Sequence, residues 1–391
     1  MIFVKREDET PSCKVKAYVL KNIARPILNW QKEMGIASAQ GTETTATSYA
    51  ETMGRNKDYY HNLISFTTVE YHPETGLVYC GITAADNDIL WTFDPETKKF
   101  NSLHFEKYGE KYDIKIHRSL IIDDDGTIYG ATAGLVEPFE YLDAPGGKIF
   151  SLNPKTNEIK ILCIPCSHDY IQTIAMDKKR KIIYGFTWPC LKFFRYDIKT
   201  NKAINFDWVG SYPHIPCVDD DGNLWGQWSN AGSSNANLLR YNPETNKIDF
   251  FRKALPKLYT ADNSGIDGMI NGEDGYIYIG TVSGALMRLD PKNVEIKYLG
   301  KPYPGTRLAG LCIGKDGLIY GGGGENYNTY IFAYDREKEK FITFGRVYDP
   351  EIKDACVIVH HITITEDRTI YAAETDNLER SGFLWECKVN P

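Results

Sequence analysis

The chain has 391 residues, 42% of them hydrophobic and 13% aromatic, and carries a net charge of −7. This acidic balance argues against a nucleic-acid partner, because phosphate binding needs a basic surface. No segment reaches the about 18 uninterrupted apolar residues that a membrane-spanning helix needs, so no membrane partner is expected. The hydrophobic content is ample for a core.

The first ten residues are rich in charge, and no apolar segment follows them. A cytoplasmic location is therefore expected, with a secreted or periplasmic one as the alternative if a signal sequence has been removed. The nine cysteines lie mostly in predicted strands, which favours reduced, buried thiols over a disulfide framework. Cys163 and Cys166 form a single CxxC pair, which does not by itself indicate a metal or redox site.

The N-terminal part contains one predicted strand, residues 14–20, in which apolar and charged residues alternate. Residues 22–60 follow with few apolar anchors. A connection of this length is usually functional or disordered. We expect an arm that lies over the top face of the fold, and a disordered tail is the alternative.

From residue 61 to residue 391 the sequence repeats seven times with a period of about 40–55 residues. Each copy has an aromatic residue in its predicted second strand, followed within two residues by Gly or Ala. These aromatic residues are Tyr79, Tyr129, Tyr184, Trp225, Tyr278, Tyr320 and Tyr371. A turn such as Asp-Gly precedes the second strand in each copy, and a turn such as Asp-Pro-Glu-Thr or Asn-Pro-Glu-Thr typically closes the third.

Seven copies of four short strands predict an all-β protein, a seven-bladed β-propeller of four-stranded blades that forms one domain over residues 1–391. The seventh copy ends at Asn390-Pro391 without a fourth strand. We therefore expect residues 14–20 to complete the last blade and close the ring, which removes a free sheet edge.

Counting back from the turns aligns the inner strands and reveals a register of mostly polar residues at their upper ends. This register holds Thr67, Arg118, Gln172, His214, Asp267, Ala309 and His360, and neighbouring positions add His117, Tyr170, Tyr212, Arg307 and His361. His61 and His168 lie just before their own inner strands. Imidazole, phenol and guanidinium groups around one hollow suit proton transfer next to an anionic substrate. The alternative is that these residues only line a water-filled channel.

The loops between the second and third strands should rise on the same face, and several are long and aromatic. They include Trp188 and Trp228. Flat aromatic rings beside Asn and Asp suit the apolar faces and hydroxyl groups of sugars, although packing between blades would also explain them. Three acidic residues, Asp219 to Asp221, suggest a cation site, but an Asp-Gly turn accounts for them.

The repeat at residues 221–225 and 238–248, Asp-Gly-Asn-Leu-Trp followed by Leu-Leu-Arg-Tyr-Asn-Pro-Glu-Thr-Asn-Lys-Ile, resembles that of seven-bladed streptogramin lyases. The polar register is similar in kind to the sites of propeller polysaccharide lyases, such as ulvan lyases and rhamnose–glucuronate lyases. This resemblance implies that Arg118 or Arg307 binds a uronate carboxylate, while Tyr170, His214 or His360 transfers protons.

We therefore expect a lyase that cleaves an acidic saccharide by β-elimination, acting as a monomer. His214, His360, Tyr170 and Arg118 are its candidate catalytic residues. The candidate substrate-binding residues are Arg307, His117, Gln172, Asp267, His361, His168, Tyr212, Trp188, Trp228 and His61. A non-catalytic propeller that binds a glycan or protein is the main alternative, and a metal-assisted hydrolase or lactonase is another. The sequence requires no cofactor, and a divalent cation remains an open alternative.

Overall fold

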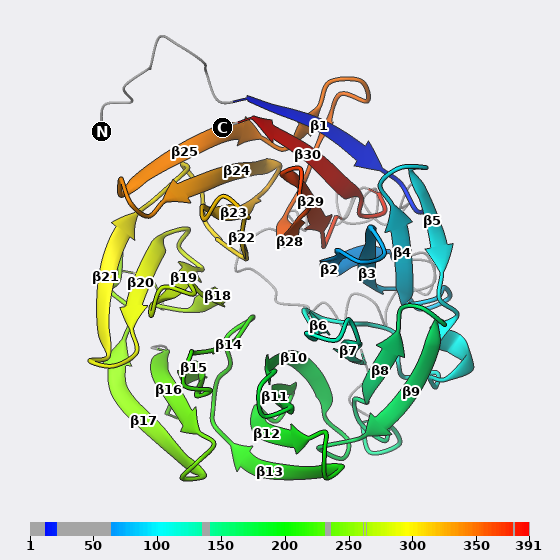
Figure 1. Cartoon of the computed structure of the whole chain (residues 1–391), viewed down its shortest axis with the longest axis vertical. Helices are drawn as coiled ribbons and strands as arrows, with labels where there is room; N and C mark the ends of the chain where they lie inside the picture. Colours follow the sequence, from blue (N-terminus) through cyan, green and yellow to red (C-terminus); the bar gives the residue numbers. More distant parts are fainter. Residues whose placement is uncertain are drawn as a thin grey trace, which may run out of the picture.

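The computed structural model describes residues 12–21, 64–134, 141–230, 236–260, 262, 264–377 and 380–390. Seven four-stranded antiparallel sheets are arranged as blades around a central axis, as Figure 1 shows. The predicted seven-bladed β-propeller is thus confirmed. Within the described residues, no helix is long and apolar enough to cross a membrane. The expected arm, residues 22–60, and His61 lie outside the described residues.

Each blade runs from an inner strand at the axis to an outer strand at the rim (Figure 1). The inner strands are β2 (Ser65–His72), β6 (Leu120–Ile122), β10 (Tyr170–Asp177), β14 (Cys217–Val218), β18 (Ile266–Asn271), β22 (Gly310–Ile313) and β28 (Val359–Ile364). The second strands are β3 (Leu77–Thr83), β7 (Ile128–Ala131), β11 (Ile182–Trp188), β15 (Leu224–Trp228), β19 (Ile277–Thr281), β23 (Ile319–Glu325) and β29 (Thr369–Glu374).

The third strands are β4 (Leu90–Asp94), β8 (Ile149–Asn153), β12 (Lys192–Asp197), β16 (Asn237–Asn242), β20 (Leu286–Asp290), β24 (Asn328–Asp335) and β30 (Leu384–Asn390). The outer strands are β5 (Lys99–Ser102), β9 (Glu158–Cys163), β13 (Lys202–Trp208), β17 (Lys247–Ala254), β21 (Glu295–Gly300), β25 (Lys340–Arg346) and β1 (Ser12–Tyr18). A short hairpin, β26 (Tyr348–Asp349) and β27 (Asp354–Ala355), and a 3-10 helix (Phe105–Lys107) lie between blades.

The ring closes through β1, the predicted N-terminal strand, which pairs with β30 of the last blade. The strand begins at Ser12 and ends at Tyr18, two residues earlier at each end than the predicted residues 14–20, because the length of β30 sets which residues can pair. The hairpin supports β1 from outside, since the Ala17 amide donates a hydrogen bond of 3.0 Å to Asp349. The first and last described strands therefore belong to one sheet (Figure 1).

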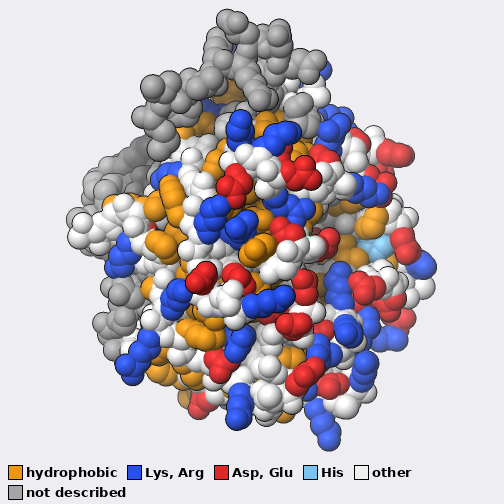
Figure 2. All heavy atoms as spheres, turned by 60° about the vertical axis from the view of Figure 1, so that its left-hand side comes forward, with side chains coloured by type: hydrophobic (Ala, Val, Ile, Leu, Met, Phe, Trp, Pro, Cys, Tyr) orange, Lys and Arg blue, Asp and Glu red, His pale blue; other side chains and the backbone are white. Residues whose placement is uncertain are grey.

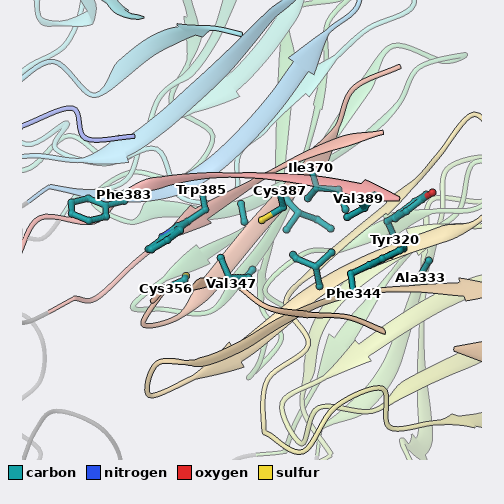
Figure 3. Close-up of a cluster of buried hydrophobic side chains, with 14 residues drawn as sticks. Tyr320, Ala333, Phe344, Val347, Cys356, Ile370, Phe383, Trp385, Cys387 and Val389 are labelled. Atoms are coloured by element: carbon teal, nitrogen blue, oxygen red, sulfur yellow. The ribbon is translucent and has the colours of Figure 1, made fainter. Parts of the chain in front are cut away.

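The core lies between neighbouring blades. In Figure 3, Trp385, Cys387 and Ile370 of the last blade pack with Tyr320 and Phe344 of the blade before it. The aromatic residue of the second strand is buried in every blade. The small residue after it is also explained: a Cβ atom on Gly321 would lie 2.1 Å from the Phe332 ring, so only glycine leaves room for that ring.

The outer surface mixes charges of both signs. On the face shown in Figure 2, Lys and Arg side chains alternate with Asp and Glu side chains, and hydrophobic atoms are scattered between them. That face has no extended region of a single sign.

Candidate functional site

The inner strands carry irregularities where the site residues lie. In four blades the pairing between the inner and second strands shifts by one residue, and the residues left out of register are Thr67, Gln172, Asp267 and His360. Such β-bulges re-aim a side chain without ending the strand. Arg118 and His214 lie just before the short inner strands β6 and β14. The register predicted by counting from the turns therefore coincides with a real structural feature.

Asp267 is the centre of the site, and its side chain is fully buried. Its Oδ1 lies 2.6 Å from His214 Nδ1 and 3.2 Å from Arg118 Nη1. Arg307 donates two hydrogen bonds of 3.1 Å, from Nε to Oδ2 and from Nη2 to Oδ1. Burial alone would raise the pKa of the Asp267 carboxyl, but the charge of Arg307 and the contacts with His214 and Arg118 hold it well below its usual range.

The histidines around Asp267 are held in the neutral form. Burial is the main cause, and the nearby cations add to it: the pKa values of His117 and His360 fall well below the usual value, and that of His214 falls to about 4. The rings are close together, with centroids 4.8 Å apart for His117 and His360 and 6.3 Å apart for His117 and His214. The site thus combines neutral imidazoles with permanent cations.

Hydrogen bonds distinguish the roles open to each histidine. His360 Nδ1 donates to the Thr67 carbonyl at 2.7 Å, so its Nε2 accepts from Arg118 Nε at 3.2 Å. His117 Nδ1 donates to the Gln172 carbonyl at 2.6 Å, and the Gln172 amide lies 3.5 Å from the other nitrogen of His117.

His214 differs from the other two histidines. Its Nδ1 donates to Asp267, and within the described part of the chain its Nε2 has no hydrogen-bond partner. The side chain is 29% exposed. A neutral imidazole that is oriented by a carboxylate and has one open nitrogen can accept a proton.

Tyr212 lies next to His214, and Trp188 lies next to Tyr212. The Tyr212 ring lies 6.0 Å from His214, and Trp188 lies edge-on to Tyr212 at 6.2 Å and is 41% exposed. Burial raises the pKa of Tyr212 to about 12. Burial, with the nearby Tyr212, also raises the pKa of Tyr170, so both phenols keep their protons at neutral pH.

The remaining predicted residues lie away from this group. The His361 ring is tied to Val69 of the first blade, at 3.1 Å from its carbonyl, and faces a cavity of about 170 Å³ inside the ring. His168 Nδ1 contacts the Ala144 carbonyl at 2.9 Å. Trp228 donates to the Phe251 carbonyl at 2.9 Å and packs edge-on against Phe250, as packing within a blade would require.

Sequence reasoning missed Lys115, which is half-buried beside the site. Its charge lowers the pKa of His117 and of His360. Lys115 lies before β6, the inner strand of its blade, so counting back from the turn stopped short of it. Its position two residues before His117 is the signal that could have found it.

The acidic turn at Asp219 has a structural explanation. Its carboxylate accepts hydrogen bonds from the Asn223 amide at 2.8 Å and from Trp225 Nε1 at 2.7 Å. These contacts fix the Asp-Gly turn and anchor the buried tryptophan. In the described residues, no group of three or more His, Cys, Asp or Glu side chains is arranged to hold a metal ion.

Comparison with known proteins identifies the fold but not a family. No family model and no curated protein matches the sequence. A catalytically inactive histidine-to-alanine variant of virginiamycin B lyase from Staphylococcus aureus, solved with quinupristin, superposes with a TM-score of 0.59 at 15% identity, covering 83% of this chain and 95% of that one. The extracellular domain of a putative one-component system from B. thetaiotaomicron superposes with a TM-score of 0.55 at 16% identity, covering 83% of this chain and 38% of that one.

The resemblance to streptogramin lyases is therefore confirmed as a resemblance of fold. At these identities the likeness establishes the propeller architecture and leaves the activity to be argued from the site itself.

Proposed function

We propose that this protein is a lyase that cleaves a uronate-containing saccharide by β-elimination at the group of residues around Asp267. One observation carries the proposal: a neutral histidine with an open nitrogen, His214, shares a buried carboxylate with two arginines. β-Elimination needs such a combination, because a cation must acidify the C–H bond next to a carboxylate and a base must then remove that proton.

The proposed reaction uses His214 as the base. Its Nε2 takes the proton from the carbon next to the carboxylate, and the electron pair of that C–H bond forms a carbon–carbon double bond. The bond between the neighbouring carbon and the bridging oxygen breaks, and Tyr170 gives its phenolic proton to that oxygen. The high pKa of Tyr170 keeps the phenol protonated before the reaction.

Asp267 and His360 are positioning residues in this scheme. Asp267 holds the tautomer of His214 in which Nε2 is free, and it orients both arginines. His360 accepts from Arg118 Nε and so has no open nitrogen for the substrate proton. The low pKa of His214, about 4, leaves it unprotonated at neutral pH. A bound anion beside it would raise that pKa and make it a stronger base.

The test is to incubate the protein with a panel of uronate-containing glycans and follow the ultraviolet absorbance of an unsaturated uronate product. His214→Asn should reduce kcat about 100- to 10,000-fold, the contribution typical of a general base. His104→Asn is the matched control, because His104 is exposed and belongs to a different part of the molecule.

Two outcomes would contradict the proposal. The first is turnover that His214→Asn leaves unchanged. The second is glycan binding without any product from the unmodified protein, which would instead support a non-catalytic propeller that binds a glycan at this site.

A further inference from the structure

The two arginines of the site lie in different electrostatic surroundings. Burial lowers the pKa of Arg307, but Asp267, Asp376 and Glu325 together raise it above the ordinary value. The pKa of Arg118 falls to about 10, because burial and the charge of Arg307 outweigh the opposing effect of Asp267. Negative charge is therefore already gathered around Arg307, and less of it reaches Arg118.

Arg118 also has an unused hydrogen-bond donor. Its Nε donates to His360 and its Nη1 to Asp267, but its Nη2 is buried without a partner among the described residues. A guanidinium group has five N–H donors, and a buried donor without an acceptor is unfavourable. An oxygen of a bound ligand would supply the missing acceptor.

Lys115 supplies a second cation on the same side of the site. It lies in an extended segment that bridges Thr83 and Ala133, two residues before His117, so the two side chains point to the same face. Its ammonium group forms no hydrogen bond or ion pair within the described residues. The nearby charges that act on it are those of Asp376 and Arg118.

We infer that Lys115 and Nη2 of Arg118 together form an anion-binding site on the His117 side of the candidate site, and that this anion-binding site takes the carboxylate of an acidic sugar. The identity of the anion as a sugar carboxylate rests on the proposed function. The position of the site rests on contacts: Arg118 and Arg307 both pair with Asp267, but only Arg118 has, among the described residues, a buried donor without an acceptor.

This placement has a consequence for the reaction. A carboxylate held by Lys115 and Arg118 would lie over the rings of His117 and His360, which are neutral and do not compete for it. His214 lies 6.3 Å away from His117 between ring centroids. The carbon next to the carboxylate then points toward the histidine with the open nitrogen.

The experiment measures binding of a glucuronate-containing disaccharide and of its carboxyl-reduced, neutral counterpart by calorimetry. The His214→Asn protein is used as the background, so that turnover does not interfere. Lys115→Met should weaken binding of the acidic sugar about 10- to 100-fold, the range for a lost hydrogen bond to a charged group, and leave the neutral sugar unchanged. Lys115→Arg should keep most of the affinity.

Lys301→Met is the matched control, because Lys301 is a lysine that contacts the Ser283 carbonyl and not the site. Unfolding of each variant should be measured in parallel, and Lys115→Met should be at least as stable as the parent, since it removes an unpaired, half-buried cation. A second measurement uses pH. The pKa of Lys115 is lowered to about 8, mainly by burial, so affinity for the acidic sugar should fall as pH rises through about 8 and should persist to higher pH in Lys115→Arg.

Equal binding of the acidic sugar by Lys115→Met and its parent would overturn the inference, and so would a failure of the parent to prefer the acidic sugar over the neutral one. The result is separable from the proposed activity. Binding that depends on Lys115 without any elimination product would keep the anion site and reject the lyase. Elimination that does not depend on Lys115 would support the lyase and reject the anion-binding site.

Discussion

The buried histidines predict that the protein loses stability in mild acid. The pKa values of His117, His214, His360 and His361 are all lowered in the folded protein, mainly by burial. In the unfolded chain a histidine has a pKa of about 6.5. As pH falls below that value, the unfolded state binds protons at these histidines and the folded state does not. The contribution of these histidines to the free energy of unfolding is therefore fully present above about pH 6.5 and is lost as pH falls toward about 4.

The size of the effect follows for the two histidines whose pKa falls to about 4, His214 and His361. By linkage, a shift from about 6.5 to about 4 costs about 2 kcal/mol per histidine between pH 7 and pH 5. Together they account for about 4 kcal/mol, and His117 and His360 act in the same direction. Asp267 does not offset the loss, because its pKa lies below this range. Glu70 acts in the opposite direction, since burial raises its pKa to about 8 and its contribution grows as pH falls, so the effect of the histidines is measured by comparing variants with the parent. Typical domains have only about 5–15 kcal/mol to lose.

The assay is denaturant unfolding at about pH 7 and about pH 5, with His361→Asn as the informative variant. His361 contacts the Val69 backbone and lies outside the proposed catalytic group, so its replacement removes one titrating ring without altering the base. The variant should lose about 2 kcal/mol less than the parent over this interval. His104→Asn should lose as much as the parent, because that ring is exposed. An identical loss in His361→Asn and the parent would refute the reasoning.

Two further predictions concern the scaffold. Val15→Asp should lower the free energy of unfolding by about 2 kcal/mol or more, because Val15 packs into the cluster that closes the ring. Lys14→Asp, on the exposed face of β1, should change it by less than about 0.5 kcal/mol. Denaturant unfolding of both variants measures this, and equal effects would contradict the closing role of β1. Asp219→Ala should lower the free energy of unfolding by about 2–3 kcal/mol, because it leaves the Trp225 Nε1 donor without its acceptor. Asp221→Ala, at the exposed part of the same turn, is the control and should be nearly neutral. A nearly neutral Asp219→Ala would contradict the structural explanation of the turn.

The fold was predictable because each repeat carries its own local signals. An aromatic residue such as Tyr184 followed by Gly185 marks a second strand, since the missing Cβ leaves room for the Phe194 ring. A residue such as Asp94 marks a turn, since its carboxylate accepts the Glu96 amide at 2.8 Å. These effects act between residues close together in the sequence, so they can be predicted from the sequence alone. The ends of β1 were less predictable because they depend on a partner strand more than 350 residues away.

The site was predictable in position but not in detail. Counting from the turns brought Arg118, His214, Asp267 and His360 to one level, and the structure joins them by hydrogen bonds. Which imidazole nitrogen is free depends on contacts between blades, such as that of His360 with the Thr67 carbonyl. Residues from opposite ends of the repeat array make these contacts, so a one-dimensional alignment could not assign roles to the histidines.

The β-bulges explain how a repeat built for packing can also hold a site. Regular inner strands pack against their neighbours through residues such as Ile174 and Met269, which leaves little freedom for polar side chains. The shifts at Gln172, Asp267 and His360 release one residue per strand from that pattern, at the same level in each blade. Because the bulge lies at the end of the strand away from the turn, the packing below it is undisturbed. The site can therefore vary from blade to blade, as its mixture of amide, carboxylate and imidazole groups does here, without loss of the fold.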